Sequence, residues 1–270
     1  MHHTRGFSLL RSVAVVALLA GLAGGCKTTA RSGDVTGSIG AGAGPSDGAQ
    51  LRQVTDAWGE RYKANPKDPE AAIAYAQALR MGEQRAQAVA VLEQSAIHNP
   101  NNMKVLGAYG RALADAGDFK RALDVLGRAH TPDKPDWRIL SVQGAVLDQM
   151  GRHAEAQRYY ASALKIAPGE PSVLSNLGLS YALSNNLPQA EKTLRQAAAG
   201  KGIDPRVRQN LALVVGLQGR FAEAEDIARA DLPPDRAAEN VAYLKQMLAT
   251  PDRFRRLGES GRSGAADRPG

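Results

Sequence analysis

Few residues of this chain have the type and spacing that catalysis or metal binding requires. Its five histidines are His2, His3, His98, His130 and His153. No two of them stand four residues apart, as a helical metal pair requires. The string Gly44-Pro45-Ser46-Asp47-Gly48 matches the G-x-S-x-G pattern of a hydrolase nucleophile, but no strand is expected before it to build the turn that motif needs. The sequence therefore predicts no catalytic site, no metal and no cofactor; the open alternative is an enzyme site assembled from scattered residues.

Cys26, the single cysteine of the chain, lies in a context that predicts lipidation. Two arginines precede an apolar run over residues 12–23, which is too short to span a bilayer and is typical of a secretory signal peptide. The run ends in Leu22-Ala23-Gly24-Gly25-Cys26, which resembles a bacterial lipobox with the leucine one position further from the cysteine than usual. We expect residues 1–25 to be removed and Cys26 to carry a lipid anchor. An ordinary signal peptide with a cysteine nearby is the alternative.

The residues after Cys26 predict a domain tethered to a membrane by a flexible chain. Lys27, in place of an aspartate, resembles the signal that directs bacterial lipoproteins to the outer membrane. Residues 26–48 form the expected anchor and a linker rich in Gly, Ser and Thr, and a flexible chain of that length spans roughly 25 Å. We therefore expect the protein at the periplasmic face of the outer membrane. Residues 258–270 are polar and Gly-rich, and are expected to form a disordered tail.

The charge of the chain indicates little about its partners. The net charge is +7, and without the two signal-peptide arginines 32 basic and 27 acidic residues leave +5, spread along the chain. No stripe of basic residues interleaved with aromatic residues is present, so the sequence predicts no nucleic-acid partner.

The remainder of the chain repeats with a period of 34 residues. The alanines that mark this period are Ala88, Ala122, Ala156, Ala190 and Ala224. Counting from Pro69 gives five repeats, over residues 69–102, 103–136, 137–170, 171–204 and 205–238. Such a period is typical of a helical solenoid, in which each repeat buries its apolar face against the next.

Positions that recur in phase indicate how each repeat folds. Position 8 is always Ala or Gly, which lets two helices approach closely, and position 15 is Gly or Asn in four repeats, which suits the turn between them. The residue before each repeat is Asp, Asn or Glu, and Asp and Asn are good helix N-caps. Position 24 is Leu92, Leu126, Tyr160 and Leu194 in the first four repeats and Ala228 in the last.

This pattern resembles the tetratricopeptide repeat over 170 of the 270 residues. The resemblance implies an all-α fold, a right-handed solenoid of paired helices. Residues 49–68 place Trp58 at position 24 of an incomplete repeat and are predicted to form an N-terminal capping helix. Residues 239–257 include an apolar stripe at helical spacing and are predicted to form a C-terminal capping helix. Asp231 stands at position 27, where a small residue is usual, so we expect an atypical last repeat.

The resemblance assigns positions 2, 5, 6, 9, 12 and 13 of the first helix in each repeat to a concave face that binds peptides. The candidate residues on this face are Gln77, Arg80, Arg111, Asp148, Asn176, Leu179, Leu183, Gln209, Asn210, Leu213 and Leu217.

The fourth and fifth repeats are the preferred binding end. Asn176 and Asn210 are one repeat apart and resemble the asparagines that hold extended peptides in this family, because an amide both donates and accepts hydrogen bonds. Local hydrogen bonds on the helix surface are the alternative. The leucines at positions 9 and 13 of the same repeats predict an apolar pocket for a partner, since no helix is expected to cover them.

The order of lipobox, Gly-rich linker with Thr36-Gly37-Ser38-Ile39, and five repeats is similar to the lipoprotein of the tight-adherence (Flp) pilus machinery. That resemblance implies a pilotin-like role at the outer membrane, with the secretin of the pilus system as the protein client. The alternative is another envelope scaffold built of tetratricopeptide repeats, serving cell-wall enzymes or outer-membrane assembly.

Overall fold

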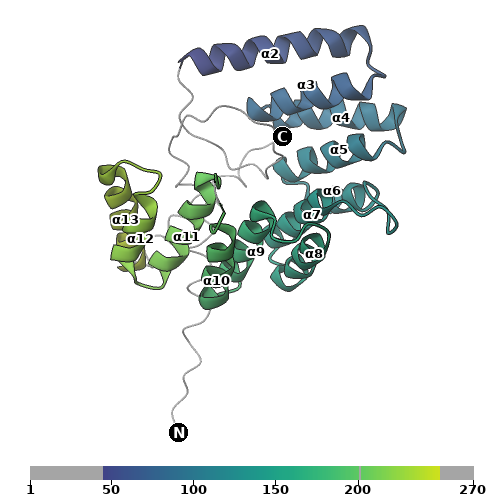
Figure 1. Cartoon of the computed structure of the whole chain (residues 1–270). Helices are drawn as coiled ribbons and strands as arrows, with labels where there is room; N and C mark the ends of the chain where they lie inside the picture. Colours follow the sequence, from purple (N-terminus) through teal and green to yellow (C-terminus); the bar gives the residue numbers. More distant parts are fainter. Residues whose placement is uncertain (1–44, 201, 250–270) are drawn as a thin grey trace, which may run out of the picture. The chain divides into compact units, whose positions relative to one another are not determined.

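The computed structural model describes residues 45–200 and 202–249, and these divide into two compact units, 45–168 and 169–249. The predicted signal peptide, Cys26, Lys27, the linker up to residue 44 and residues 250–270 lie outside the described residues. Every regular element in the described part is an α-helix, and consecutive helices pack side by side within each unit (Figure 1).

The N-terminal unit holds one leading helix and the first three predicted repeats. The leading helix is α2, Pro45–Ala64, which packs on α3. The helix pairs of the three repeats are α3 (Pro69–Met81) with α4 (Arg85–His98), α5 (Met103–Asp115) with α6 (Phe119–Gly127), and α7 (Trp137–Gln149) with α8 (His153–Ile166).

The C-terminal unit holds the fourth and fifth repeats and a final helix. Its helix pairs are α9 (Pro171–Leu183) with α10 (Leu187–Ala197), and α11 (Pro205–Leu217) with α12 (Phe221–Ala228). The final helix is α13, Pro234–Ala249, which packs on both α11 and α12.

The predicted starts and turns of the repeats are confirmed. Each of the five N-cap side chains accepts a hydrogen bond from the backbone N–H two residues further along, even where the cap is Glu170. Position 15 has positive φ in every repeat, from 58° at Glu83 to 84° at Gly219. Glycine or asparagine adopts this conformation at low cost, so the turn recurs with the sequence period.

The small residues at positions 8 and 20 allow the two helices of a repeat to touch. A Cβ atom added to Gly110 would lie 2.4 Å from Cγ of Leu126, and one added to Gly178 would lie 2.6 Å from Cγ of Leu194. The marker alanines are at most 1% exposed. Position 24 therefore fills the space that position 8 leaves open, and this contact forms the core of each of these repeats.

The ends of the repeat array differ from the predicted bounds. Helix α2 begins at Pro45 instead of residue 49, and α13 begins at Pro234 instead of residue 239, because proline is favoured in the first turn of a helix. Pro45–Gly48, part of the G-x-S-x-G string, therefore lies in the first turn of a helix. The second helices of the repeats vary in length: α12 has 8 residues and α6 has 9, whereas α4 and α8 have 14.

Candidate peptide-binding site

Two predicted groove residues of the N-terminal unit lie on α3, and only one of them is open. Gln77 is exposed. The side chain of Arg80 is 20% exposed, and its Nε donates to Oδ2 of Asp115 at 2.5 Å, which ties α3 to α5. Arg111, on α5, is half-buried. Arg80 therefore holds two repeats together through an ion pair.

The side chain of Asp148 on α7 lies in the interior of its repeat, not on an open groove. Its carboxylate is 7% exposed and accepts hydrogen bonds from the Tyr160 hydroxyl at 3.0 Å and from Nδ1 of His153 at 2.8 Å. Burial, together with the charge of Asp148, raises the pKa of Tyr160 well above its usual value. The predicted place of Asp148 on the peptide-binding face is thus corrected, because its side chain is enclosed by α7 and α8.

The two asparagines of the C-terminal unit lie on neighbouring first helices, as predicted. Nδ2 of Asn210 on α11 donates to Oγ of Ser175 on α9 at 3.0 Å. Ser175 is 6% exposed, so this hydrogen bond joins the fourth and fifth repeats at a nearly buried position. Asn176 is half-buried on α9. This bond between two helices is not the local helix-surface bond of the alternative, and the role of Asn210 in holding a peptide stays a prediction.

The leucines of the predicted apolar pocket are more covered than expected. Leu183 is 8% exposed and Leu213 is 3% exposed, while Leu179 and Leu217 are half-buried. Leu213 packs against Leu244 and Met247 of α13. The final helix therefore covers the face of α11 that we expected to be open, because its apolar stripe needs a partner surface.

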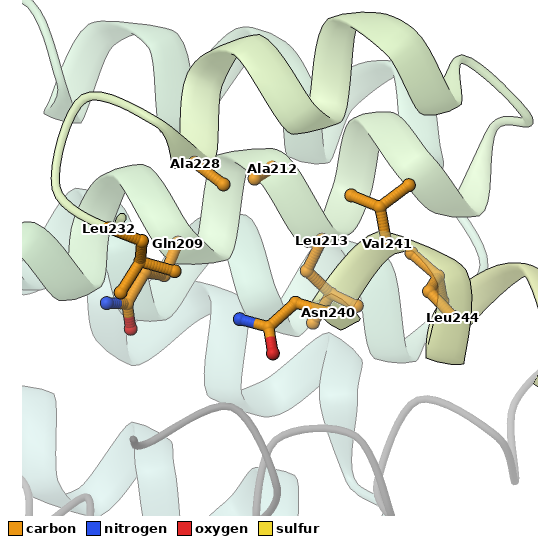
Figure 2. Close-up of a pocket in the computed structure, with 8 residues that line it drawn as sticks. All are labelled: Gln209, Ala212, Leu213, Ala228, Leu232, Asn240, Val241 and Leu244. Atoms are coloured by element: carbon orange, nitrogen blue, oxygen red, sulfur yellow. The ribbon is translucent and has the colours of Figure 1, made fainter. Parts of the chain in front are cut away.

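A hollow remains between α11, α12 and α13, and it is the candidate site in the C-terminal unit. Its lining residues are Gln209, Ala212, Leu213, Ala228, Leu232, Asn240, Val241 and Leu244. Figure 2 shows the amides of Gln209 and Asn240 at its edge, directed toward the same side. The hollow is shallow, with a volume of about 30 Å³, far below the ~300–1,000 Å³ of small-molecule pockets.

The hollow arises at a repeat position where the sequence departs from its own pattern. In the first four repeats position 24 carries a leucine or tyrosine that is at most 1% exposed. In the last repeat it is Ala228, which packs with Ala212, Leu232 and Ala237 in one buried cluster beside the hollow. Ala228 was the sequence signal for this site. Asn240 and Leu232 carried none, because they lie outside the repeat positions that line a groove.

An ion pair fixes the chain beside the hollow. Nε of Arg208 on α11 donates to Oδ2 of Asp231 at 2.6 Å, and Nη2 contacts the other carboxylate oxygen. The carboxylate of Asp231 is 7% exposed. Asp231 follows the short α12, so its departure from the repeat pattern reflects a loop anchored to α11. This anchor places Leu232 in the lining of the hollow.

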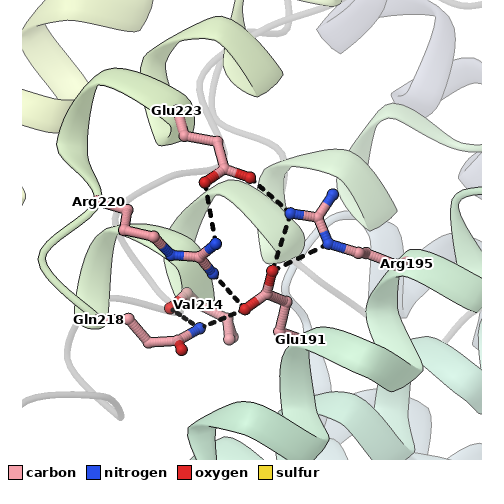
Figure 3. A network of polar contacts seen from close by, with 6 residues as sticks. All are labelled: Glu191, Arg195, Val214, Gln218, Arg220 and Glu223. Atoms are coloured by element: carbon pink, nitrogen blue, oxygen red, sulfur yellow. Dashed lines mark hydrogen bonds and ion pairs between the residues drawn. The ribbon is translucent and has the colours of Figure 1, made fainter.

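A second polar network joins α10 to α11 and α12 (Figure 3). Glu191 accepts hydrogen bonds from Nε of Arg195 at 2.9 Å, from Nε2 of Gln218 at 2.8 Å, and from Arg220. Glu223 completes the network by accepting from Arg195 at 2.5 Å and Arg220 at 3.0 Å. Burial alone would raise the pKa of Glu191, but these donors outweigh it and lower the pKa. The network holds the fourth and fifth repeats in register and thereby supports the site.

Other kinds of site are not found in the described part of the chain. No group of three or more His, Cys, Asp or Glu side chains in residues 45–200 and 202–249 could hold a metal ion. None of the helices described combines the length and hydropathy of a membrane span.

Comparison with family models matches three segments. Models described as tetratricopeptide repeat match residues 149–214 and 205–230. The model of the anaphase-promoting complex, cyclosome, subunit 3 matches residues 57–129. With the paired helices and their 34-residue period, these matches settle the architecture. The chain has the tetratricopeptide-repeat fold. Comparison with curated protein sequences gives no significant match.

Solved structures with the same fold come from several contexts. The anaphase-promoting complex hetero-tetramer Cut9–Hcn1 has a TM-score of 0.61 at 13% identity, over 76% of this chain and 41% of that chain. PilW, a widely conserved type IV pilus biogenesis factor, has a TM-score of 0.58 at 16% identity, over 78% of this chain and 92% of that chain. A tetratricopeptide repeat protein from Parabacteroides merdae has a TM-score of 0.56 at 13% identity, over 75% and 88%. At these identities the likeness concerns the fold, and this chain spans about two fifths of the first protein's chain.

Proposed function

We propose that this chain is a lipid-anchored scaffold of the bacterial outer membrane that binds a client peptide through its tetratricopeptide repeats. The observation that carries the binding role is the hollow of the last repeat, where an apolar lining lies next to two amides. An amide can pair with both the N–H and the C=O of a peptide main chain. The helices around the hollow are held by the Arg208–Asp231 pair and the Glu191 network, so the site is formed before a peptide arrives.

The anchoring part of this proposal rests on Cys26 and its neighbours. A diacylated Cys26 would hold the protein at the membrane, and the Gly-rich residues after it would let the repeats work roughly 25 Å from the surface. Lys27 supports the outer membrane as the destination. In this arrangement the lipid anchors the protein at the membrane, and the repeats determine which client it binds.

We propose further that the client belongs to a pilus assembly system, as for the TadD lipoprotein of tight-adherence pili. The lipobox, the Gly-rich linker and five repeats in this order support that reading. The fold shared with PilW, itself a type IV pilus biogenesis factor, is consistent with it. A pilotin-like protein would bind a segment of the secretin and bring it to the outer membrane.

Deletion of the gene tests this proposal directly. We expect fewer assembled secretin multimers in outer-membrane fractions and fewer surface pili, with both restored by the full chain expressed in trans. Copurification of the secretin with the full chain from detergent-solubilised membranes should accompany this. Unchanged secretin multimers and piliation in the deletion strain would refute the pilus role.

The competing proposal is an envelope scaffold for cell-wall enzymes or for outer-membrane assembly. One fold serves many partners, so the repeats alone do not name the client. This alternative would be favoured if the deletion left pili intact while altering cell shape or outer-membrane protein content.

A further inference from the structure

We propose that α2 pairs with α2 of a second copy of this chain, in antiparallel orientation, through a face that bears Leu51, Val54 and Trp58. This self-association goes beyond the proposed function. It depends neither on the hollow of the last repeat nor on the identity of the client, because a scaffold for either kind of client can form such a dimer.

Helix α2 occupies the place of the second helix in a repeat that lacks its first helix. One side of α2 packs on α3 (Figure 1), where Gly59 lies against the ring of Tyr75 and the ring centroids of Tyr62 and Tyr75 are 5.8 Å apart. The other side corresponds to the surface that the first helix covers in each complete repeat. No helix of the N-terminal unit packs on that side of α2.

The residues on this open face are larger than their counterparts in the repeats. Position 20, an alanine that is at most 1% exposed in every repeat, is Val54 in α2, and Val54 is 38% exposed. Position 24 is Trp58, which is half-buried, and the guanidinium of Arg61 lies 4.9 Å from the centroid of its ring. A first helix of the repeat type approaches closely through the alanine at position 20, so it does not fit this face. The face suits a helix at the wider separation of ordinary helix pairs, about 8–10 Å.

The spacing of the apolar residues makes this face complementary to itself. Leu51, Val54 and Trp58 stand at i, i+3 and i+7 and therefore form one stripe along the helix. When two such helices run antiparallel about a two-fold axis at Val54, Leu51 of each copy falls near Trp58 of the other. Val54 then meets Val54 on the axis. The same patch thus serves both copies, as an interface with two-fold symmetry requires.

The charges beside the stripe favour this pairing. Arg61 lies seven residues from Val54, which is about 10 Å along the helix, so the two copies of Arg61 lie roughly 20 Å apart. By register, each Arg61 falls opposite residue 47 of the other copy, which is an aspartate in the sequence. Antiparallel helices also place opposite ends of their dipoles together. The pairing therefore brings opposite charges together and keeps like charges apart.

The dimer expected from one helix pair is weak in solution. Helix α2 has 20 residues, and a single pair of such helices buries less than the ~1,200 Å² at the lower end of standard protein–protein interfaces. Two copies held on one membrane by the proposed anchor would meet at a higher effective concentration. Cross-linking traps brief encounters and is therefore the first measurement.

Disulfide trapping tests the position of the two-fold axis. In the full chain with Cys26→Ser, Val54→Cys introduces the single cysteine, and two copies on the axis meet within the ~4.4–6.8 Å Cα separation of a disulfide. The matched control is Gln53→Cys, at an exposed position that points away from the stripe. We expect oxidation of the detergent-purified chain to give a covalent dimer roughly tenfold faster for Val54→Cys than for the control. Equal rates would overturn the inference.

Mixing two single-cysteine chains tests the register. Chains with Leu51→Cys and with Trp58→Cys, oxidised together, should give mixed disulfide dimers in preference to dimers of either chain with itself. The two copies of residue 51 lie about 9 Å apart along the helix axis, and those of residue 58 about 12 Å, whereas residue 51 lies within about 2 Å of residue 58 of the other copy in that direction. An excess of like-with-like dimers would show parallel pairing and would overturn the antiparallel arrangement.

A charge substitution separates this face from other surfaces of the chain. Val54→Arg places two like charges on the axis and should abolish the rise of mass with concentration that sedimentation velocity detects for the Cys26→Ser parent, whereas Gln53→Arg should retain it. Both variants should keep the parent's melting temperature, because both positions are exposed. A Val54→Arg chain that still associates would place the contact elsewhere and overturn the inference. Client copurification is measured separately, so these outcomes leave the peptide-binding function standing.

Discussion

Tyr109 shows how one polar side chain can join three helices of neighbouring repeats. Its hydroxyl on α5 donates to Oε1 of Glu93 on α4 at 2.8 Å. Nη2 of Arg121 on α6 donates to the Tyr109 hydroxyl oxygen and to Oε1 of Glu93, each at 2.5 Å. Burial raises the pKa of Tyr109 to about 12, and the hydrogen bond to Glu93 adds to the effect. Glu93 stands at position 25 of its repeat, and Arg121 stands at position 19 of the next repeat. In the C-terminal unit the same two positions carry Arg195 and Glu223, which form an ion pair with the charges reversed.

The Tyr109 hydroxyl should make the stability of the protein fall at alkaline pH. An unfolded tyrosine ionises near pH 10, whereas folded Tyr109 keeps its proton to about 12. This contribution is therefore fully present below pH 10 and is lost as the pH rises through 12. Tyr109→Phe should lower the free energy of unfolding by about 1 kcal/mol at pH 7. The difference in this free energy between variant and wild type should become smaller between about pH 10 and 12. Urea unfolding of both proteins at pH 7, 10 and 11.5 measures this difference. A difference that stays constant with pH would contradict the prediction. The control is Tyr243→Phe, because Tyr243 is exposed.

At the scale of elements, the contact between the two helices of a repeat depends on the size of position 8. A Cβ atom added to Gly144 would lie 2.6 Å from the ring of Tyr160, which is 1% exposed and cannot move aside. Gly144→Ala should therefore destabilise the protein by about 1–3 kcal/mol. Gly127→Ala, at a helical position with no atom within 4 Å, should be neutral or stabilising. Thermal melts of the two variants check this, and equal melting temperatures would mean that α7 and α8 do not pack as described.

The hydrogen bond between Asn210 and Ser175 should couple the fourth and fifth repeats. Asn210→Ala leaves the Ser175 hydroxyl nearly buried without this donor, which should cost about 1–2 kcal/mol. Ser175→Ala in the same chain should recover part of the loss, because both polar partners are then removed. A double-mutant cycle by urea unfolding measures the coupling. Strictly additive effects would show that Asn210 acts elsewhere, and its predicted contact with a peptide main chain would then gain support.

Features set by neighbouring residues were predictable from the sequence, and contacts between distant segments were not. N-caps such as Asp68 and turns such as Gly117 depend on local backbone chemistry, so they recur with the period. Asn210 pairs with Ser175, which is 35 residues away, and nothing in the repeat pattern specifies that pair. The cover that α13 places over Leu213 was missed for the same reason, since Leu244 and Met247 of α13 lie beyond the last repeat. Ala228 was visible in the sequence, but its consequence required knowledge of what else lines the space.

At the scale of the whole molecule, the proposed recognition site and the predicted lipid anchor belong to different parts of the chain. The hollow and its supporting ion pairs lie within residues 169–249, while the predicted lipid attachment is at Cys26. A scaffold of this kind can change its client through the lining of one repeat without changing its destination. The two roles should therefore respond to different substitutions.

Cys26→Ser should abolish anchoring and leave client recognition intact. A serine has no thiol to receive the diacylglycerol, so the variant should take up no radiolabelled palmitate and should leave the outer-membrane fraction. A single acyl chain gives only weak membrane affinity, of about 10⁴ M⁻¹, whereas two chains anchor stably, so losing lipidation should redistribute the protein fully. The purified variant should bind its client as the wild type does, since the repeats are untouched. Wild-type protein without palmitate label would show that the lipobox reading is wrong, and a labelled wild type whose variant stays in the outer membrane would place the anchor elsewhere.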